Sequence, residues 1–217
     1  MPSVSDPGLL VLLGLRLRSF ATAAVVAETV GLPESDVEAR LERAGAADQA
    51  RFRDGRMTGW MLTPAGRTEG ERLLGLELDA TGQRQAVNDA YHRFLAINQR
   101  MLDVCTDWQL RTVDGAQVVN DHLDQAHDQA VVAHLVELDA AMLAITADLA
   151  EVLERFGGYG SRLAGALAKV QGGDLDWFTK PTIDSYHTVW FELHENLLAT
   201  LGIERGREPT PTGEEAC

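Results

Sequence analysis

The feature that most constrains the fold is an apolar stripe in the second half of the sequence. Apolar residues recur there at alternating steps of four and three without a polar substitution: Val131, Leu135, Leu138, Met142, Ile145, Leu149, Val152 and Phe156. This spacing places every one of them on a single face of a long helix. Such a face is either the seam of a dimer or the core of a helical bundle within one chain, and we favour the bundle for most of it.

The composition is that of a globular chain. Of the 217 residues, 45% are hydrophobic and 24% are charged, which suffices for one large or two small domains with their own cores. The two cysteines, Cys105 and Cys217, are too few for a disulfide scaffold and favour a reducing cytoplasm. The longest apolar run near the start, Leu9 to Leu13, is far shorter than a bilayer span, so we expect no membrane association.

The charge is distributed unevenly. The formal net charge is −14, which argues against a general nucleic-acid-binding surface. Residues 1–75 carry 9 Arg against 10 acidic residues, whereas residues 76–217 carry 10 Lys plus Arg against 23 acidic residues. This asymmetry predicts two regions with different roles.

Three short helices are expected in the first region. Residues 9–20 and 21–30 form the first two, and Gly31 ends the second at a C-terminal cap position. The third begins after Leu32-Pro33-Glu34-Ser35 and turns its residues Val37, Leu41 and Ala44 inward.

A hairpin and a further helix follow. Residues 51–63 surround the pair Asp54-Gly55, which is a strong hairpin signal. Thr63 and Pro64 then provide an N-cap and a first helical residue. Three helices, a β-hairpin and another helix together predict a winged helix.

The run from Gly55 to Arg67 also carries a family resemblance. Its segment Leu62-Thr63-Pro64-Ala65-Gly66-Arg67 resembles the end of the wing and the following helix in bacterial transcription regulators of the MarR and PadR type. The resemblance covers about the first third of the chain. It implies a third helix in the DNA major groove and wing arginines on the flanking phosphates.

The resemblance also implies particular DNA contacts. The residues facing the groove would be Ser35, Asp36, Ala39, Arg40 and Arg43, and the wing contacts would be Arg51, Arg53 and Arg56. However, residues 33–46 contain four acidic residues against two Arg, where a helix that faces phosphates should be cationic. The alternative is a winged helix that binds a basic protein partner and no DNA.

The second region is expected to be helical throughout. Helices are predicted over most of 73–108 with a break near Thr81-Gly82, from about 127 to 156, over 161–170 and over 182–201. Pieces within 98–109 and 176–195 resemble helical regions of actinobacterial winged-helix proteins of unknown activity. Residues from Glu204 onward have the composition of a disordered acidic tail.

A helical region attached to a winged helix suits dimerisation and the binding of a small-molecule effector. We expect the effector site between its helices, lined by Tyr91, Trp108, Trp177, His187 and Trp190. The effector would act by changing the separation of the two winged helices of a homodimer. The common alternative for the tryptophans is packing in the core.

Enzymatic chemistry has weaker support. The sequence contains no nucleophile elbow, Walker loop or dinucleotide fingerprint, so an enzyme would depend on dispersed groups such as Asp107, His122, Asp184, His187 and Glu192. A polar group around Asn120, with Asp121, His122, Asp124 and His127, lacks the spacing of a recognisable metal site. No cofactor and no metal are therefore predicted.

These features predict a mainly α protein. A winged-helix domain at 1–75 precedes an all-α helical bundle at 76–203 and a tail at 204–217. The expected function is that of a cytoplasmic, homodimeric, ligand-responsive transcription regulator that binds double-stranded DNA.

Overall fold

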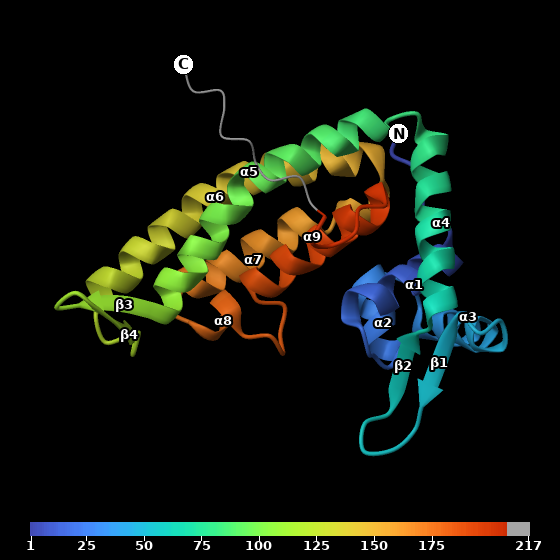
Figure 1. Cartoon of the computed structure of the whole chain (residues 1–217), viewed down its shortest axis with the longest axis horizontal. Coiled ribbons are helices and arrows are strands. Elements are labelled where there is room, and N and C mark those ends of the chain that lie inside the picture. The colour runs from blue at the N-terminus through green and yellow to red at the C-terminus, as the bar shows by residue number, and fades with distance from the viewer. Residues whose placement is uncertain (208–217) are drawn as a thin grey trace. The chain divides into compact units, whose positions relative to one another are not determined.

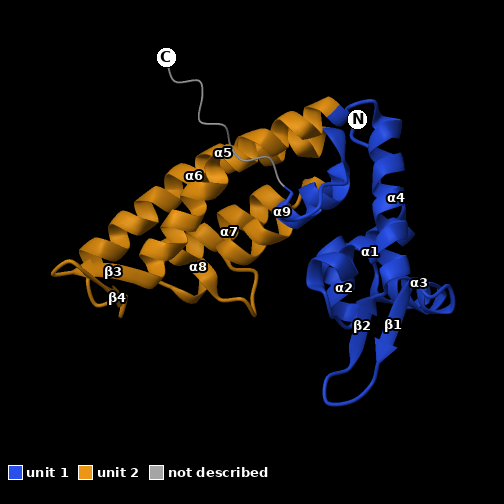
Figure 2. Ribbon diagram, viewed as in Figure 1, with its two compact units in different colours: residues 1–84, 152–155, 194–208 blue, residues 85–151, 156–193, 209–217 orange. Residues whose placement is uncertain are grey.

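The computed structural model describes residues 1–207 and is mainly helical, with two small antiparallel hairpins (Figure 1). Most of the predicted tail, including Cys217, lies outside the described residues. The described chain forms two compact units (Figure 2). Unit 1 comprises residues 1–84, 152–155 and 194–207, and unit 2 comprises residues 85–151 and 156–193.

Unit 1 begins with three helices close to the predicted positions: α1 (Pro7–Arg18), α2 (Ala23–Val30) and α3 (Glu34–Ala46). The Asp6 carboxylate caps α1 by accepting hydrogen bonds from the backbone N–H groups of Gly8 and Leu9. Gly31 ends α2 in the left-handed conformation, with φ of 69°. The buried residues of α3 are Val37, Leu41 and Ala44, as the spacing predicted.

The predicted hairpin around Asp54-Gly55 is confirmed. Strands β1 (Ala50–Arg53) and β2 (Gly59–Leu62) pair antiparallel, with Phe52 opposite Trp60 and their ring centroids 5.2 Å apart. Backbone hydrogen bonds of 2.7 and 3.0 Å between Ala21 and Trp60 attach β2 to the connection between α1 and α2. The hairpin is thus held against the first helices of unit 1.

The sequence Thr63-Pro64-Ala65-Gly66 forms the start of helix α4 (Pro64–Thr81), with Thr63 as its N-cap. The Thr63 hydroxyl accepts a hydrogen bond from the Gly66 N–H and donates one to the Asp48 carbonyl. This linkage brings the first turn of α4 onto the backbone before β1. A Cβ at Gly66 would collide with the Gln49 carbonyl, so only glycine fits there.

The core of unit 1 includes distant parts of the sequence. One buried cluster joins α1, α2, α3 and the hairpin, and a second contains Leu9, Leu13, Leu74 and Ala199. Ala199 belongs to α9 (Tyr186–Leu201), and this helix contributes to unit 1 from His194 onward. The Arg155 guanidinium adds bonds to Glu77 and Thr200.

Unit 2 is built from nearly all of α5 (Arg84–Gln109) and α6 (Gln125–Val152), from α7 (Tyr159–Gln171), the short helix α8 (Asp176–Thr179) and the first half of α9. The short 3-10 helix η1 (Glu154–Phe156) lies mostly in unit 1 and contributes only Phe156 to unit 2. Cross-helix bonds fix their packing. Arg100 pairs with Glu137 between α5 and α6, Tyr186 bonds to Asp139 between α9 and α6, and Arg162 pairs with Glu192 between α7 and α9.

The apolar stripe lies inside the chain. All eight of its side chains, from Val131 to Phe156, are at most 4% exposed. The helix itself ends at Val152, before the predicted end at residue 156. A short 3-10 turn follows it and precedes the glycines at 157 and 158. The stripe is therefore core within one chain, which was the favoured interpretation.

The prediction that residues 76–203 are all helical is wrong at one place. Strands β3 (Leu110–Val113) and β4 (Ala116–Val119) form a second hairpin, with Val113 opposite Ala116. Asp114 and Gly115 occupy the two-residue turn with φ of 50° and 82°. A two-residue turn with positive φ at both positions matches the twist of antiparallel strands, and Asp-Gly favours it.

Helix α6 is the one helix within residues 1–207 with the length and apolarity of a membrane span. A core helix of a soluble protein has the same properties. Because its stripe is buried in the chain and Glu137 and Asp148 pair with arginines of α5, we treat α6 as such a core helix.

Candidate functional site

The Lys and Arg residues of the chain differ in whether another side chain binds their charged group. Thirteen of the 19 Lys and Arg residues are held by a carboxylate, a hydroxyl or an aromatic ring. The other six form no ion pair with any residue in 1–207: Arg40, Arg43, Arg51, Arg53, Arg56 and Arg67. All six lie in α3, the β1–β2 hairpin and the first turn of α4.

The hairpin places three of these arginines in solvent. Arg51 and Arg53 are two positions apart on β1 and so point to the same face, while Phe52 points to the other and packs on Trp60. Arg56 follows in the connection between the strands, and all three are exposed. Residues 50–63 hold these three arginines and a single acid, Asp54, so the hairpin is a locally cationic element in an acidic chain.

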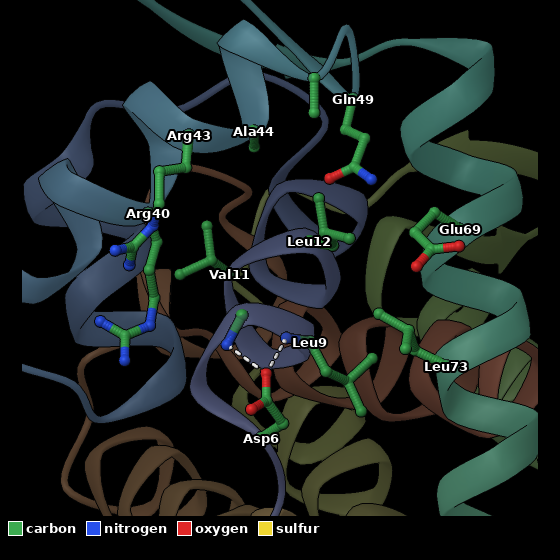
Figure 3. Close-up of a pocket in the computed structure, with 12 residues that line it drawn as sticks. Asp6, Leu9, Val11, Leu12, Arg40, Arg43, Ala44, Gln49, Glu69 and Leu73 are labelled. Carbon is green, nitrogen blue, oxygen red and sulfur yellow. Dashed lines mark hydrogen bonds between the residues drawn. The ribbon is translucent and has the colours of Figure 1, made fainter.

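The residues predicted on α3 separate into two sets. Ser35, Asp36 and Ala39 are exposed and lie away from the buried side of the helix. Arg40 and Arg43 instead line a groove of about 420 Å³ formed with α1 and α4. Figure 3 shows both arginines on one side of this groove, with Glu69 across α1 from them.

The exposed surface of α3 is acidic. Glu34, Asp36, Glu38 and Glu42 are all exposed, and none pairs with an arginine in the part of the chain that the structure describes. Arg40 donates to the backbone carbonyl of Asp36 rather than to a carboxylate. The cationic surface of unit 1 is therefore carried by the hairpin more than by α3.

The five residues predicted to line an effector site differ in their surroundings. Tyr91 is fully buried, and Trp190 is 3% exposed with its indole N–H donating to Asn98. The Trp177 ring is covered by the Lys169 ammonium, 3.1 Å from its centroid. His187 is half-buried, and burial lowers its pKa. Trp108 is the one of the five that lines the cavity described next.

Unit 2 contains a cavity of about 430 Å³, here called the His122 cavity, at the point where α5 ends and α6 begins. Its apolar wall includes Trp108, Val132 and Leu175. Its polar groups are the side chains of His122, Asp128 and three glutamines. Trp108 and His122 also line a second hollow of about 410 Å³.

Hydrogen bonds fix the orientation of His122. Its Nδ1 lies 3.0 Å from an Asp128 carboxylate oxygen, and its backbone N–H donates to Asn120. The Asn120 amide donates one hydrogen to the Trp108 carbonyl and the other to Asp128. The Asn120 Nδ2 atom also lies 3.2 Å from His122 Nδ1. Because a carboxylate oxygen accepts hydrogen bonds, the closer contact between His122 Nδ1 and Asp128 assigns the proton to Nδ1 of the imidazole.

Packing and backbone conformation add to this constraint. The His122 ring lies 4.5 Å from the Trp108 ring, and Phe178 meets Trp108 edge-on at 4.4 Å. His122 also has a φ of 58°, a conformation that non-glycine residues adopt only when the surroundings impose it. The Nε2 atom has no hydrogen-bond partner within residues 1–207.

The other candidate catalytic groups do not converge. Arg162 binds Glu192 with two hydrogen bonds and also binds Asp184, so both carboxylates are used in a mostly buried ion cluster. Burial alone would lower the pKa of Arg162, but hydrogen bonds and charges of Glu192 and Asp184 outweigh it and raise that pKa. Asp107 is exposed.

Among residues 1–207, neither a reactive thiol nor a metal cluster is found. Burial raises the pKa of Cys105 to about 11, which keeps this thiol protonated and unreactive. Within residues 1–207, no three His, Cys, Asp or Glu side chains are placed to hold a metal ion. The Nε2–H of His127 donates a hydrogen bond of 2.7 Å to the Asp107 backbone carbonyl. The polar group near Asn120 is thus an oriented Asp–His pair, and its member Asp128 was missed by the sequence analysis.

No protein-family model, curated protein or solved structure matches this chain.

Proposed function

We propose that this protein is a cytoplasmic transcription regulator that binds double-stranded DNA through a winged helix in unit 1. The observation that carries the proposal is the set of six arginines without an ion-pair partner, all between residues 40 and 67. Other cations of the described chain are already engaged. Cations left without a carboxylate are free to neutralise phosphates and release counterions.

The hairpin is the principal contact in this proposal. Arg51, Arg53 and Arg56 are exposed and have few acidic neighbours, so they suit the phosphates that flank a groove. Ser35 and Ala39 lie on the outer face of α3, where a recognition helix would meet base edges. Arg40 and Arg43 border the groove of unit 1 and would reach phosphates from the side of α3.

A second function is favoured by the acidic surface of α3. Four exposed carboxylates on one short helix would repel phosphates and would attract a basic protein. In that case unit 1 is a protein-binding module without an operator. A stoichiometric basic partner that remains bound after nuclease treatment would support this reading.

The proposed regulator is a homodimer, because a two-fold DNA site matches two symmetric winged helices. Helix α6 offers a surface for it. Opposite the buried stripe, its solvent-facing side carries Ala133, Val136, Ala140, Leu143 and Ala144, with the exposed Glu137 beside them. An exposed apolar patch of this kind is typical of a protein interface, so we assign this face to a second copy of the chain.

An arginine on this face tests the dimer. Ala144→Arg is expected to produce a monomer in sedimentation equilibrium, because two charges would be buried at the two-fold interface. Ala86→Arg, at another exposed helical alanine, is the control and should leave the dimer intact. If the wild-type chain is monomeric at micromolar concentration, the dimer proposal fails.

Fluorescence anisotropy tests DNA binding directly. The duplexes are the region upstream of the protein's own gene and a scrambled sequence, each titrated at several salt concentrations. Preference for the upstream duplex with a steep salt dependence supports the regulator. Absence of binding by the folded protein overturns it and favours the protein-binding alternative.

A further inference from the structure

The His122 cavity has the chemistry of a binding site for a small organic cation. Its lining contains one carboxylate, Asp128, and neither lysine nor arginine. The chain around it is acidic as well, since residues 120–132 include Asp121, Asp124 and Asp128 without a Lys or Arg. A cleft lined by one sign of charge concentrates ligands of the opposite sign.

The orientation of His122 specifies what the ligand must offer. Because Nδ1 carries the proton that is donated to Asp128, the neutral ring presents the lone pair of Nε2. This atom has no partner among the described residues, so it is available to accept a hydrogen bond. The Asp128 charge directly behind the ring strengthens that acceptor.

The remaining walls fit an apolar body attached to the donor group. Trp108, Val132, Val170 and Leu175 supply the apolar surface, and glutamine side chains supply further carbonyl oxygens. A volume of about 430 Å³ is within the range of small-molecule sites. Each feature selects the same combination of an N–H donor, a positive charge and a small hydrophobic group.

We propose that the His122 cavity binds an organic ammonium ion, with the ammonium donating to Nε2 of His122 and the apolar part packing near Trp108. The use of this cavity as an effector site rests on the proposed regulator function. The binding does not depend on that function, and it is measured without DNA so that its failure would concern the cavity alone.

The probes are three molecules of similar shape: benzylamine, benzyl alcohol and benzoate. Each is titrated into the full-length ¹⁵N-labelled protein at pH 8 and low salt, while NMR follows the His122 ring nitrogens and the Trp108 indole N–H. Benzylamine should bind roughly tenfold or more tightly than benzyl alcohol, as expected for a charge-assisted hydrogen bond. Benzoate should not bind. Equal affinities for amine and alcohol, or shifts centred elsewhere, overturn the proposal.

Two variants identify the groups responsible. Asp128→Asn removes the charge, and His122→Asn removes Nε2 with a residue that tolerates positive φ. Both should abolish the preference for the amine. His134→Asn, at an exposed position of α6, is the control and should retain it. Retention of the preference in His122→Asn contradicts the assignment, and the wild-type comparison remains decisive if either variant does not fold.

Discussion

Units 1 and 2 differ in how completely their cations are paired. In unit 2, Arg93, Arg100, Arg111 and Arg162 pair with carboxylates, Lys180 pairs with Asp176, and Lys169 covers an aromatic ring. In unit 1, six arginines have no such partner in residues 1–207. The cations of unit 2 are thus neutralised within the acidic chain. The six arginines of unit 1 are the ones available to an anionic partner.

The largest expected effect comes from removing the available arginines. The triple variant Arg51→Ala, Arg53→Ala, Arg56→Ala should weaken DNA binding on the order of 100-fold and flatten its salt dependence by about two to three phosphate contacts. Its thermal stability should change little, because these side chains are exposed and have no described partner to lose. Anisotropy against the upstream duplex gives both the affinity and the salt slope.

The matched control removes three charges from unit 2. Arg93, Arg100 and Lys180 form exposed ion pairs, so replacing all three with alanine changes the net charge equally at a small cost in stability. DNA affinity should remain close to that of the wild type. If the two triple variants lose affinity equally, the difference between the units has no bearing on DNA binding.

An effect of similar size, on stability rather than on DNA affinity, is expected from breaking a paired cation of unit 2. Glu192 is 3% exposed and makes two hydrogen bonds to Arg162, so Glu192→Ala should lower the free energy of unfolding by about 3 kcal/mol. Urea denaturation measures the loss. Glu137→Ala, which breaks an exposed pair with Arg100, should cost less than about 1 kcal/mol. Similar losses in both variants would show that burial of the pair is unimportant.

The two hairpins show how much of the fold could be predicted from the sequence. Both contain Asp-Gly, but only the first was predicted, because Thr63-Pro64 marks a helix start directly after it. The strands of the second are largely exposed and carry no alternating apolar pattern. In the sequence, Asp114-Gly115 alone marks the second hairpin, and such a turn also suits a connection between helices.

The candidate sites were predictable only in part. The wing arginines follow from local sequence, because a hairpin fixes the faces of neighbouring residues. The pairing of His122 with Asp128 depends on a loop residue in the left-handed conformation and on the packing of Trp108, and neither is visible in residue spacing. Of the predicted aromatic site, Trp108 lines the His122 cavity, whereas Tyr91 and Trp190 are buried in the core.

The smallest expected effect concerns a buried carboxylate of unit 2 that is bonded to a neutral partner. Asp139 is 7% exposed and accepts a hydrogen bond of 3.2 Å from the Tyr186 hydroxyl. Burial raises the pKa of Asp139, and the bond from Tyr186 opposes this only in part. A carboxyl whose pKa is raised by folding contributes its full stability below its unfolded pKa of about 4 and loses it as the pH rises.

Asp139→Asn should therefore stabilise the protein slightly at pH 7, because the amide oxygen still accepts from Tyr186 and no charge is buried. The gain should disappear as the pH falls below about 4, where the wild-type carboxyl is also neutral. Thermal unfolding at several pH values measures it, with the exposed Asp148→Asn as the control that should show no gain at pH 7. Destabilisation by Asp139→Asn at pH 7 would mean that the ionised Asp139 carboxylate stabilises unit 2 without a cation beside it. The comparison of paired and unpaired charges in the two units would then have to cover carboxylates as well as cations.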